Sequence, residues 1–253
     1  MDKQQGCITP PAITRSLSER GVHSNLNVDK SEGGSFEVGG RITALKAQKR
    51  DKERVNVYLD GEYAFSLKAI VAARLRVGRN LSDEEIDALL WEDSFQKAYD
   101  RALDFLSYRP RSQAEVRRYL RRKEVHPRVS EEVIRRLTAA GLLDDVSFAR
   151  YWVENRESFN PRSPRMLRYE LRQKGLDSET ISQALEGLDE ERSAYRAAAK
   201  RARRWAHLDR ESFRQKAGSF LKRRGFSYQV IESVLDRLWE ELSKGRDVNK
   251  NPL

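Results

Sequence analysis

The alternation of apolar and polar positions predicts a small β-sheet near the start of the chain. Two short runs with period-two alternation flank Asp60-Gly61, namely Val55, Val57 and Leu59 before it and Tyr63, Phe65 and Leu67 after it. Asp-Gly between alternating runs is typical of a tight β-hairpin. An isolated hairpin is only marginally stable in water, so we expect a third strand at 42–48 or a helix packed against it.

After about Ser66 the pattern changes to apolar residues spaced three and four apart, which indicates helices. Strand is therefore expected only within 42–67. The helix ends carry recognisable signals, because capping boxes, a proline at a first helical position and a glycine past a helix end occur in order. These signals are Ser82 with Glu85, Ser112 with Glu115, His126-Pro127 and Gly141.

The helical part repeats itself with a period of about fifty residues. Pro110-Arg111-Ser112 recurs as Pro161-Arg162-Ser163, and a third copy follows at a slightly shorter shift. The apolar positions that correspond are Val116 and Leu167; Leu120, Leu171 and Leu221; Val125, Leu176 and Phe226; Leu185 and Leu235; and Leu137, Leu188 and Leu238. Fifty residues accommodate three short helices, so the fold class predicted is all-α: about nine helices in three tandem three-helix repeats, forming an elongated curved molecule.

The expected domain organisation follows from these patterns. Glycine-rich, polar sequence without apolar periodicity predicts a disordered arm at the start. The predicted segments are a disordered arm at 1–40, a β-hairpin plus helical lead-in at 41–97, repeats at 98–145, 146–190 and 191–242, and a flexible tail at 243–253. In each repeat the same turn precedes the last helix, with Gly175 and Gly225 at equivalent positions and Glu124 in the first copy. The cap expected after this turn is His126, Asp177 or Ser227.

Charge is concentrated toward the end of the chain. The 253 residues include 49 Lys and Arg against 39 Asp and Glu, a net charge of +10. Residues 191–242 hold 13 basic and 7 acidic side chains. Such an excess indicates an acidic polymer or an acidic protein surface as partner. A solvated helical surface without a partner is the alternative interpretation.

Basic residues also recur in register. Each copy places cations at the first and third positions after its central leucine: Arg121 and Lys123, Arg172 and Lys174, Lys222 and Arg224. They form a candidate partner-binding row, although cations in a last helical turn also gain stability from the helix dipole alone. Both interpretations stay open. A second candidate cluster, without counterpart in the other copies, comprises Lys200, Arg201, Arg203 and Arg204 beside Trp205.

The residues offer little chemistry. There is no phosphate-binding glycine loop, no zinc-type spacing of His23, His126 and His207, and one cysteine, Cys7. No cofactor or metal is therefore expected. Asp144-Asp145 could hold Mg²⁺ in a nuclease, but an Asp before a helix more often caps it. A binding protein is favoured over an enzyme, and without an apolar span or secretion signal a cytoplasmic location is expected.

Three features of the sequence carry a resemblance to a known family. They are the three repeats, the segment Ser107-Tyr108-Arg109-Pro110-Arg111-Ser112, and the junction Gly141-Leu142-Leu143-Asp144-Asp145-Val146-Ser147-Phe148-Ala149, which is followed by Trp152 and Arg156. The chain resembles the RecX family of recombination regulators over roughly 42–242. The resemblance implies a bacterial cytoplasmic protein in homologous recombination, DNA repair and the SOS response. It would bind the RecA recombinase filament on DNA and limit its recombinase, ATPase and coprotease activities.

The resemblance implies no catalytic residues, no cofactor, no membrane and no small-molecule substrate. Two other function classes remain as alternatives. One is an architectural protein whose arginines bind single-stranded or double-stranded DNA nonspecifically. The other is a metal-dependent nuclease at Asp144 and Asp145. Binding to bare DNA at several salt concentrations and turnover with Mg²⁺ discriminate them.

Overall fold

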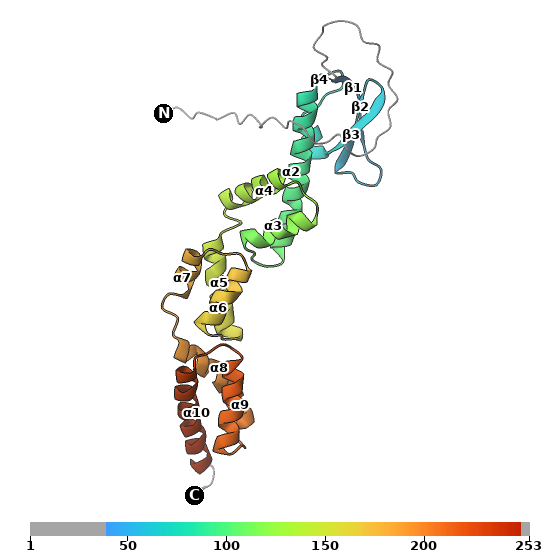
Figure 1. Ribbon diagram of the computed structural model, residues 1–253. Helices are drawn as coiled ribbons and strands as arrows, with labels where there is room; N and C mark the ends of the chain where they lie inside the picture. Colours follow the sequence, from blue (N-terminus) through green and yellow to red (C-terminus); the bar gives the residue numbers. More distant parts are fainter. Residues whose placement is uncertain (1–38, 249–253) are drawn as a thin grey trace, which may run out of the picture. The chain divides into compact units, whose positions relative to one another are not determined.

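The computed structural model describes residues 39–248, which divide into two compact units, one on each side of the boundary between Lys97 and Ala98 (Figure 1). Most of the arm expected at 1–40, including Cys7, lies outside the described residues. Its expected end overlaps the first strand by one residue, because Gly40 already belongs to β1.

The first unit is an antiparallel sheet of four strands: β1 (Gly40–Ala47), β2 (Arg54–Leu59), β3 (Glu62–Lys68) and β4 (Asn80–Leu81), in the order β3-β2-β1-β4. A short helix, α1 (Ala69–Ala72), follows β3. Asp60 and Gly61 have φ of 49° and 92°, as a turn of the primed type requires. The predicted hairpin and its third strand are therefore confirmed.

The expectation that strand is confined to 42–67 is wrong at both ends. Strand β1 begins at Gly40, β3 runs to Lys68, and β4 lies well beyond the predicted region. Gly78, at φ 94°, turns the chain back onto β1, so that the Gly78 amide donates to the Ile42 carbonyl at 2.7 Å. Strand β4 has only two residues, too few to show an alternating pattern, so its pairing with β1 is what reveals it. Its Leu81 completes a core with Ile42 and Val57.

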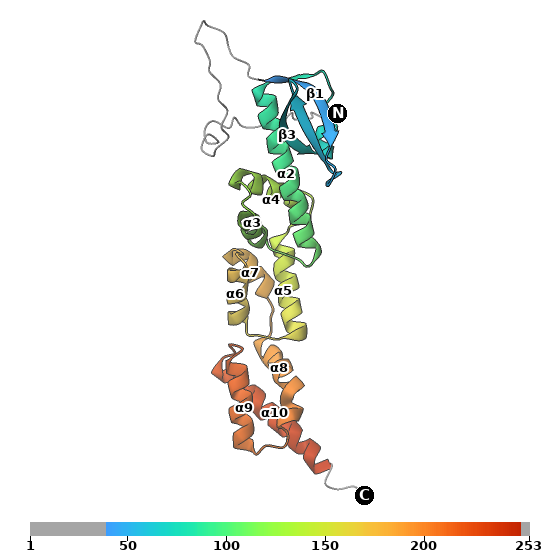
Figure 2. The same ribbon diagram turned by 90° about the vertical axis from the view of Figure 1, so that its right-hand side faces the viewer.

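Helix α2 (Asp83–Ser107) begins at the predicted capping box: Ser82 N donates to Glu85 Oε2 at 3.0 Å, and Glu85 N donates to Ser82 Oγ at 3.3 Å. Residues 98–107 of α2 form the first helix of the second unit. That unit continues with α3 (Gln113–Arg122), α4 (Pro127–Ala139), α5 (Asp145–Phe159), α6 (Pro164–Gln173), α7 (Ser178–Leu185), α8 (Glu190–Trp205), α9 (Arg210–Lys222) and α10 (Tyr228–Val248) (Figure 2).

The prediction of about nine helices in three three-helix groups is confirmed for the described part of 98–242. The first group is the end of α2 with α3 and α4, the second is α5 to α7, and the third is α8 to α10. The tail predicted from 243 starts inside a helix, because α10 continues to Val248.

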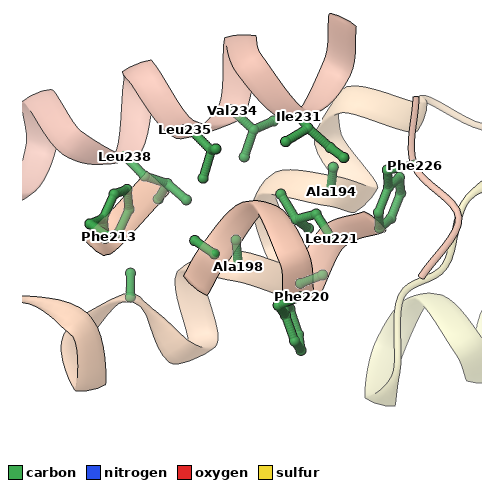
Figure 3. Packing of buried hydrophobic residues seen from close by; sticks show 13 residues of the cluster. Ala194, Ala198, Phe213, Phe220, Leu221, Phe226, Ile231, Val234, Leu235 and Leu238 are labelled. Carbon is green, nitrogen blue, oxygen red and sulfur yellow. The ribbon is translucent and has the colours of Figure 1, made fainter. Parts of the chain in front are cut away.

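The predicted apolar register forms the repeat cores. Figure 3 shows the third core, where α8, α9 and α10 contribute Ala198, Leu221 and Leu235 among others. The register residues that are buried are Val116, Leu120, Leu137, Leu167, Leu171, Leu176, Leu185, Leu221, Phe226, Leu235 and Leu238. Val125 and Leu188 are only half-buried. Each repeat therefore gains its own share of hydrophobic stabilisation.

The predicted helix caps are present. Ser112 and Glu115 make the reciprocal capping box of α3, and the His126 ring accepts from Arg128 N at 3.3 Å ahead of α4. Asp177 accepts from Thr180 N at 2.8 Å at the start of α7. Each cap satisfies an amide that has no partner within its own helix, which stabilises these short helices.

The turn glycines pack against the preceding repeat. Gly175 and Gly225 both have φ 85°, and a Cβ added to them would lie 2.4 Å from Ala114 Cβ and 2.2 Å from Met166 Cγ respectively. Glu124, at the same place in the first repeat, adopts φ 57° and is exposed. Glycine is thus required where the turn meets an earlier repeat, because both the backbone conformation and the close approach exclude a side chain.

Candidate binding surface

The contact between the first and second repeats, here called the first junction, is centred on Glu115. Ser112 Oγ donates to the Lys174 carbonyl at 2.6 Å, while Glu115 receives Lys174 Nζ at 2.7 Å and Arg109 Nη2 at 2.9 Å. Burial opposes ionisation of Glu115, but the hydrogen bonds and charges of Arg109 and Lys174 outweigh it and lower its pKa from 4.5 to about 2. The first junction therefore compensates part of its positive charge from within.

The contact between the second and third repeats, the second junction, uses the same backbone positions. Ser163 N donates to the Arg224 carbonyl at 3.2 Å, and Arg224 Nη1 donates to the Pro161 carbonyl at 2.8 Å and to Asn160 Oδ1. Met166 takes the place that Glu115 has in the first repeat. Burial, and then the charges of Arg201 and Arg162, lower the pKa of Arg224.

The third position of the predicted basic row has a structural role at both junctions. Lys174 and Arg224 are half-buried and hold consecutive repeats together. Lys123, in the first repeat, is exposed, with its Nζ 5.9 Å from the centre of the Tyr119 ring. Lys174 and Arg224 therefore serve the junctions first, and a partner would meet only the donors that these internal bonds leave over.

The first position of the row is different. Arg121, Arg172 and Lys222 lie in the last turns of α3, α6 and α9 and are all exposed. Within the described residues, no hydrogen bond or ion pair engages their side chains. These three cations, one per repeat, are available to a partner, as is the exposed Lys123 of the first repeat.

The cluster at 200–204 is not one surface. Lys200 Nζ donates to the Ser158 carbonyl at 2.7 Å, which links α8 to the end of α5. The Arg201 guanidinium lies 4.8 Å from the centre of the Phe220 ring, and Arg204 is exposed. Arg203 belongs to α8, but its side chain lies outside the described part. Among the described side chains of this cluster, Arg201 lines two hollows.

Two adjoining hollows, of about 400 and about 320 Å³, lie around the second junction. They share Arg201, Phe220 and Arg223, and the other residues that line them are Trp205, Gln215, Lys216 and Ser219 in one and Asn160, Arg162 and Arg224 in the other. No acidic residue is among these described lining residues. Figure 3 shows the Phe220 ring at the edge of the third core, directed away from α10. We call this site the basic hollow.

Sequence reasoning missed Arg162, Lys216 and Arg223 as members of this site. A comparison of the copies could have found one of them, because Lys216 replaces Met166 of the second repeat and Glu115 of the first. Arg223 replaces Gln173, but the first repeat already has a cation, Arg122, at this position. Arg162 gives no such signal, because Arg111 is its counterpart in the first repeat.

Both members of the acid pair engage helix ends. Asp144 caps α5, accepting from Val146 N at 2.9 Å, as predicted. Asp145 instead accepts from Gln113 N, at the start of α3, at 2.9 Å. Burial raises the pKa of Asp145, the Gln113 amide opposes the shift, and neighbouring Asp144 adds to it. In the part of the chain that the structure describes, no three His, Cys, Asp or Glu side chains gather as a metal site.

Family profiles match both units. They are the Regulatory protein RecX N-terminal domain over residues 40–82 and the first, second and third RecX three-helix domains over 98–137, 144–185 and 189–235.

Among residues 39–248, no helix is long and apolar enough to cross a bilayer.

Known proteins agree with these profiles. Regulatory protein RecX of Bacillus subtilis (strain 168) is 38% identical over 217 residues, which cover 84% of this chain and 81% of that protein. The Bacillus velezensis relative of the same name is 36% identical, covering 78% and 76%.

Solved structures agree as well. A crystal structure of regulatory protein RecX has a TM-score of 0.60 at 32% identity, covering 78% of this chain and 99% of that one. RecX from Lactobacillus salivarius has a TM-score of 0.51 at 27% identity, covering 58% and 97%. With the four profiles in chain order and two bacterial relatives above 30% identity, the chain belongs to the RecX family of regulatory proteins.

Proposed function

We propose that this protein binds the RecA recombinase filament on DNA and restrains its recombinase, ATPase and coprotease activities in the cytoplasm. The observation that carries the proposal is that a member of a regulatory family presents one exposed cation at the same position of each repeat. These cations are Arg121, Arg172 and Lys222. A row with repeat spacing suits a partner that itself repeats, because several weak contacts then act together.

Binding, rather than catalysis, is the role that the polar residues support. Asp144 and Asp145 are engaged by backbone amides. Exposed ion pairs each contribute about 0.2 to 1 kcal/mol, so single substitutions in the row should have small effects and several together a clear one.

The test is a charge reversal in every repeat. The triple variant Arg121→Glu, Arg172→Glu, Lys222→Glu should bind preformed recombinase filaments at least tenfold more weakly, about 1.4 kcal/mol, and should lose inhibition of filament ATPase in parallel. The measurements are binding at two salt concentrations and ATP turnover, with folding verified by thermal melting.

The matched control reverses one other exposed arginine per repeat: Arg128→Glu, Arg165→Glu and Arg192→Glu. Net charge changes equally, so a general electrostatic effect weakens both triples alike. The proposed surface is wrong if the folded Arg121→Glu, Arg172→Glu, Lys222→Glu variant binds filaments as well as the parent protein. In that case the three cations only stabilise the C-terminal ends of their helices.

A second candidate function is direct, nonspecific DNA binding. The charge excess in the third repeat favours it, because phosphate contacts release counterions and make binding strongly salt-dependent. Binding to bare single-stranded DNA that matches filament binding in affinity would favour this second candidate over recombinase recognition.

A further inference from the structure

The second junction lacks the acid that balances the first. In the first junction Glu115 receives both Arg109 and Lys174. The corresponding residues of the second junction are Met166, Asn160 and Arg224, so the cation remains and the carboxylate does not. Among the described residues, the Arg224 guanidinium donates hydrogen bonds to neutral oxygens, those of Asn160 and Pro161.

Other cations gather at the same place. Arg162 and Arg201 lie close enough to Arg224 to lower its pKa, after burial, which is the main cause. Arg162 is paired with Glu170 at 2.7 Å, but Glu170 is shared with Arg156 at 2.8 Å. Lys216 and Arg223 also line the basic hollow, and no ion pair within the described residues engages either. Apart from Arg162, the cations of the hollow therefore have no carboxylate partner among the described residues.

We propose that the basic hollow is a phosphate site that takes the backbone of single-stranded nucleic acid. An external phosphate would supply the negative charge that Glu115 supplies in the first junction. Guanidinium groups from three segments converge there, and their fork of donors matches phosphate oxygens. The walls come from both repeats, Asn160 and Arg162 from one and Arg223 and Arg224 from the other, so an occupied site also ties the two together.

A phosphodiester chain fits better than an acidic peptide. The two hollows adjoin through Arg201, Phe220 and Arg223, which suits an anion that continues from one to the other. Trp205, which is half-buried, adds aromatic surface to the lining, whereas the Phe220 ring is buried and lies against the Arg201 and Arg224 guanidinium groups. A basic groove with aromatic side chains is the usual composition of single-strand sites without sequence preference, because every base has a face that can stack.

The experiment uses the full chain and a fluorescent oligothymidylate, without recombinase, so its outcome is independent of the proposed function. Met166→Glu, which copies Glu115 into the second junction, should place a carboxylate beside Arg224. Lys216→Gln with Arg223→Gln should remove two cations that have no structural partner. We expect the plot of log affinity against log salt concentration to become shallower. Its slope should decrease in magnitude by about 1 for Met166→Glu and by about 2 for the Lys216→Gln, Arg223→Gln variant. The weakening should be about tenfold or more at about 0.1 M salt.

The control is Arg128→Gln with Arg192→Gln, two exposed arginines away from the hollow, which should bind like the parent. Pyrophosphate should compete with the oligonucleotide, and the oligonucleotide should raise the melting temperature of the parent but not of the double hollow variant. The proposal is overturned if the folded Lys216-Arg223 variant binds like the control pair. It is also overturned if polyglutamate binds the hollow and oligothymidylate does not.

Discussion

The two repeat junctions share a backbone and differ in charge. In both, a serine at a helix start meets a carbonyl of the following repeat, at 2.6 Å between Ser112 Oγ and Lys174 O and at 3.2 Å between Ser163 N and Arg224 O. In both, a glycine at φ 85° permits the approach. At the third helical position the first junction has a carboxylate, that of Glu115, and the second has Met166, although Glu170 pairs with Arg162 nearby.

The difference shows that packing and charge balance are separable in this repeat. Backbone conformation and glycine determine how closely two repeats approach, and the junction forms whether a glutamate or a methionine fills the third helical position. Because Arg224 is half-buried and bonds to neutral oxygens rather than to a carboxylate, an external anion would lower the cost of burying its charge at the second junction. The same geometry therefore yields a closed structural contact in one place and a candidate binding site in the other.

The largest effect is expected from Gly225→Ala. The new Cβ would overlap Met166 Cγ and Ser163 Oγ, at 2.2 and 2.7 Å, and the residue would remain at positive φ. Strain and overpacking together should lower the free energy of unfolding by about 2 to 5 kcal/mol, as should Gly175→Ala at the first junction. Denaturant unfolding measures both.

Glu124→Gly is the matched control for these glycines, because it relieves strain at φ 57° and should leave stability equal or up to about 1 kcal/mol higher. A Gly225→Ala protein as stable as the parent would contradict the close approach of the two repeats.

The next effect distinguishes the junctions by charge. Glu115→Gln should cost about 3 kcal/mol, because lowering the pKa from 4.5 to about 2 corresponds to that much stabilisation of the ionised carboxylate. Met166→Gln, at the same place in the second junction, should cost less than about 1.5 kcal/mol, because no ion pair is lost. Equal losses by urea unfolding would show that Glu115 acts through packing and not through charge.

Acid should weaken the first junction selectively. The pKa of Glu115 is lower in the folded protein, so its stabilisation is complete above about pH 4.5 and is lost as the pH falls toward 2. About 2 kcal/mol should disappear between pH 7 and pH 3 from this group alone. Stability measured against pH should show this slope in the parent and in Met166→Gln, and a shallower one in Glu115→Gln.

The smallest effects concern the acid pair. Asp144→Ala removes the α5 cap and should cost about 0.5 to 2 kcal/mol. Asp145→Asn keeps an oxygen for Gln113 N and removes a carboxylate whose pKa burial raises, so stability should change by no more than about 0.5 kcal/mol at pH 7. Neither folded variant should lose action on the recombinase. Loss of that action with unchanged melting would revive a chemical role for the pair.

Much of the fold could be predicted because helix patterning is local. Val116, Leu167 and Leu120 occupy the core as their spacing predicts, and the Ser112 capping box and the Asp60-Gly61 turn formed where short-range signals placed them. Strand β4 could not be predicted, because it exists only through pairing with β1, which lies distant in sequence. The candidate site was found in part, since Arg201 and Arg224 were predicted but Lys216 and Arg223 were not.

The sequence by itself determined the repeat, its period, its helix caps and its excess of positive charge, because each depends on neighbours a few residues apart. Which cations are available was decided by the tertiary structure. Lys174 and Arg224 look like Arg172 and Lys222 in the sequence, yet the first two lie between repeats and the other two are exposed. Whether a cation pairs with an acid inside the protein depends on residues some sixty positions away. Lys174, for example, pairs with Glu115, and only folding brings the two together.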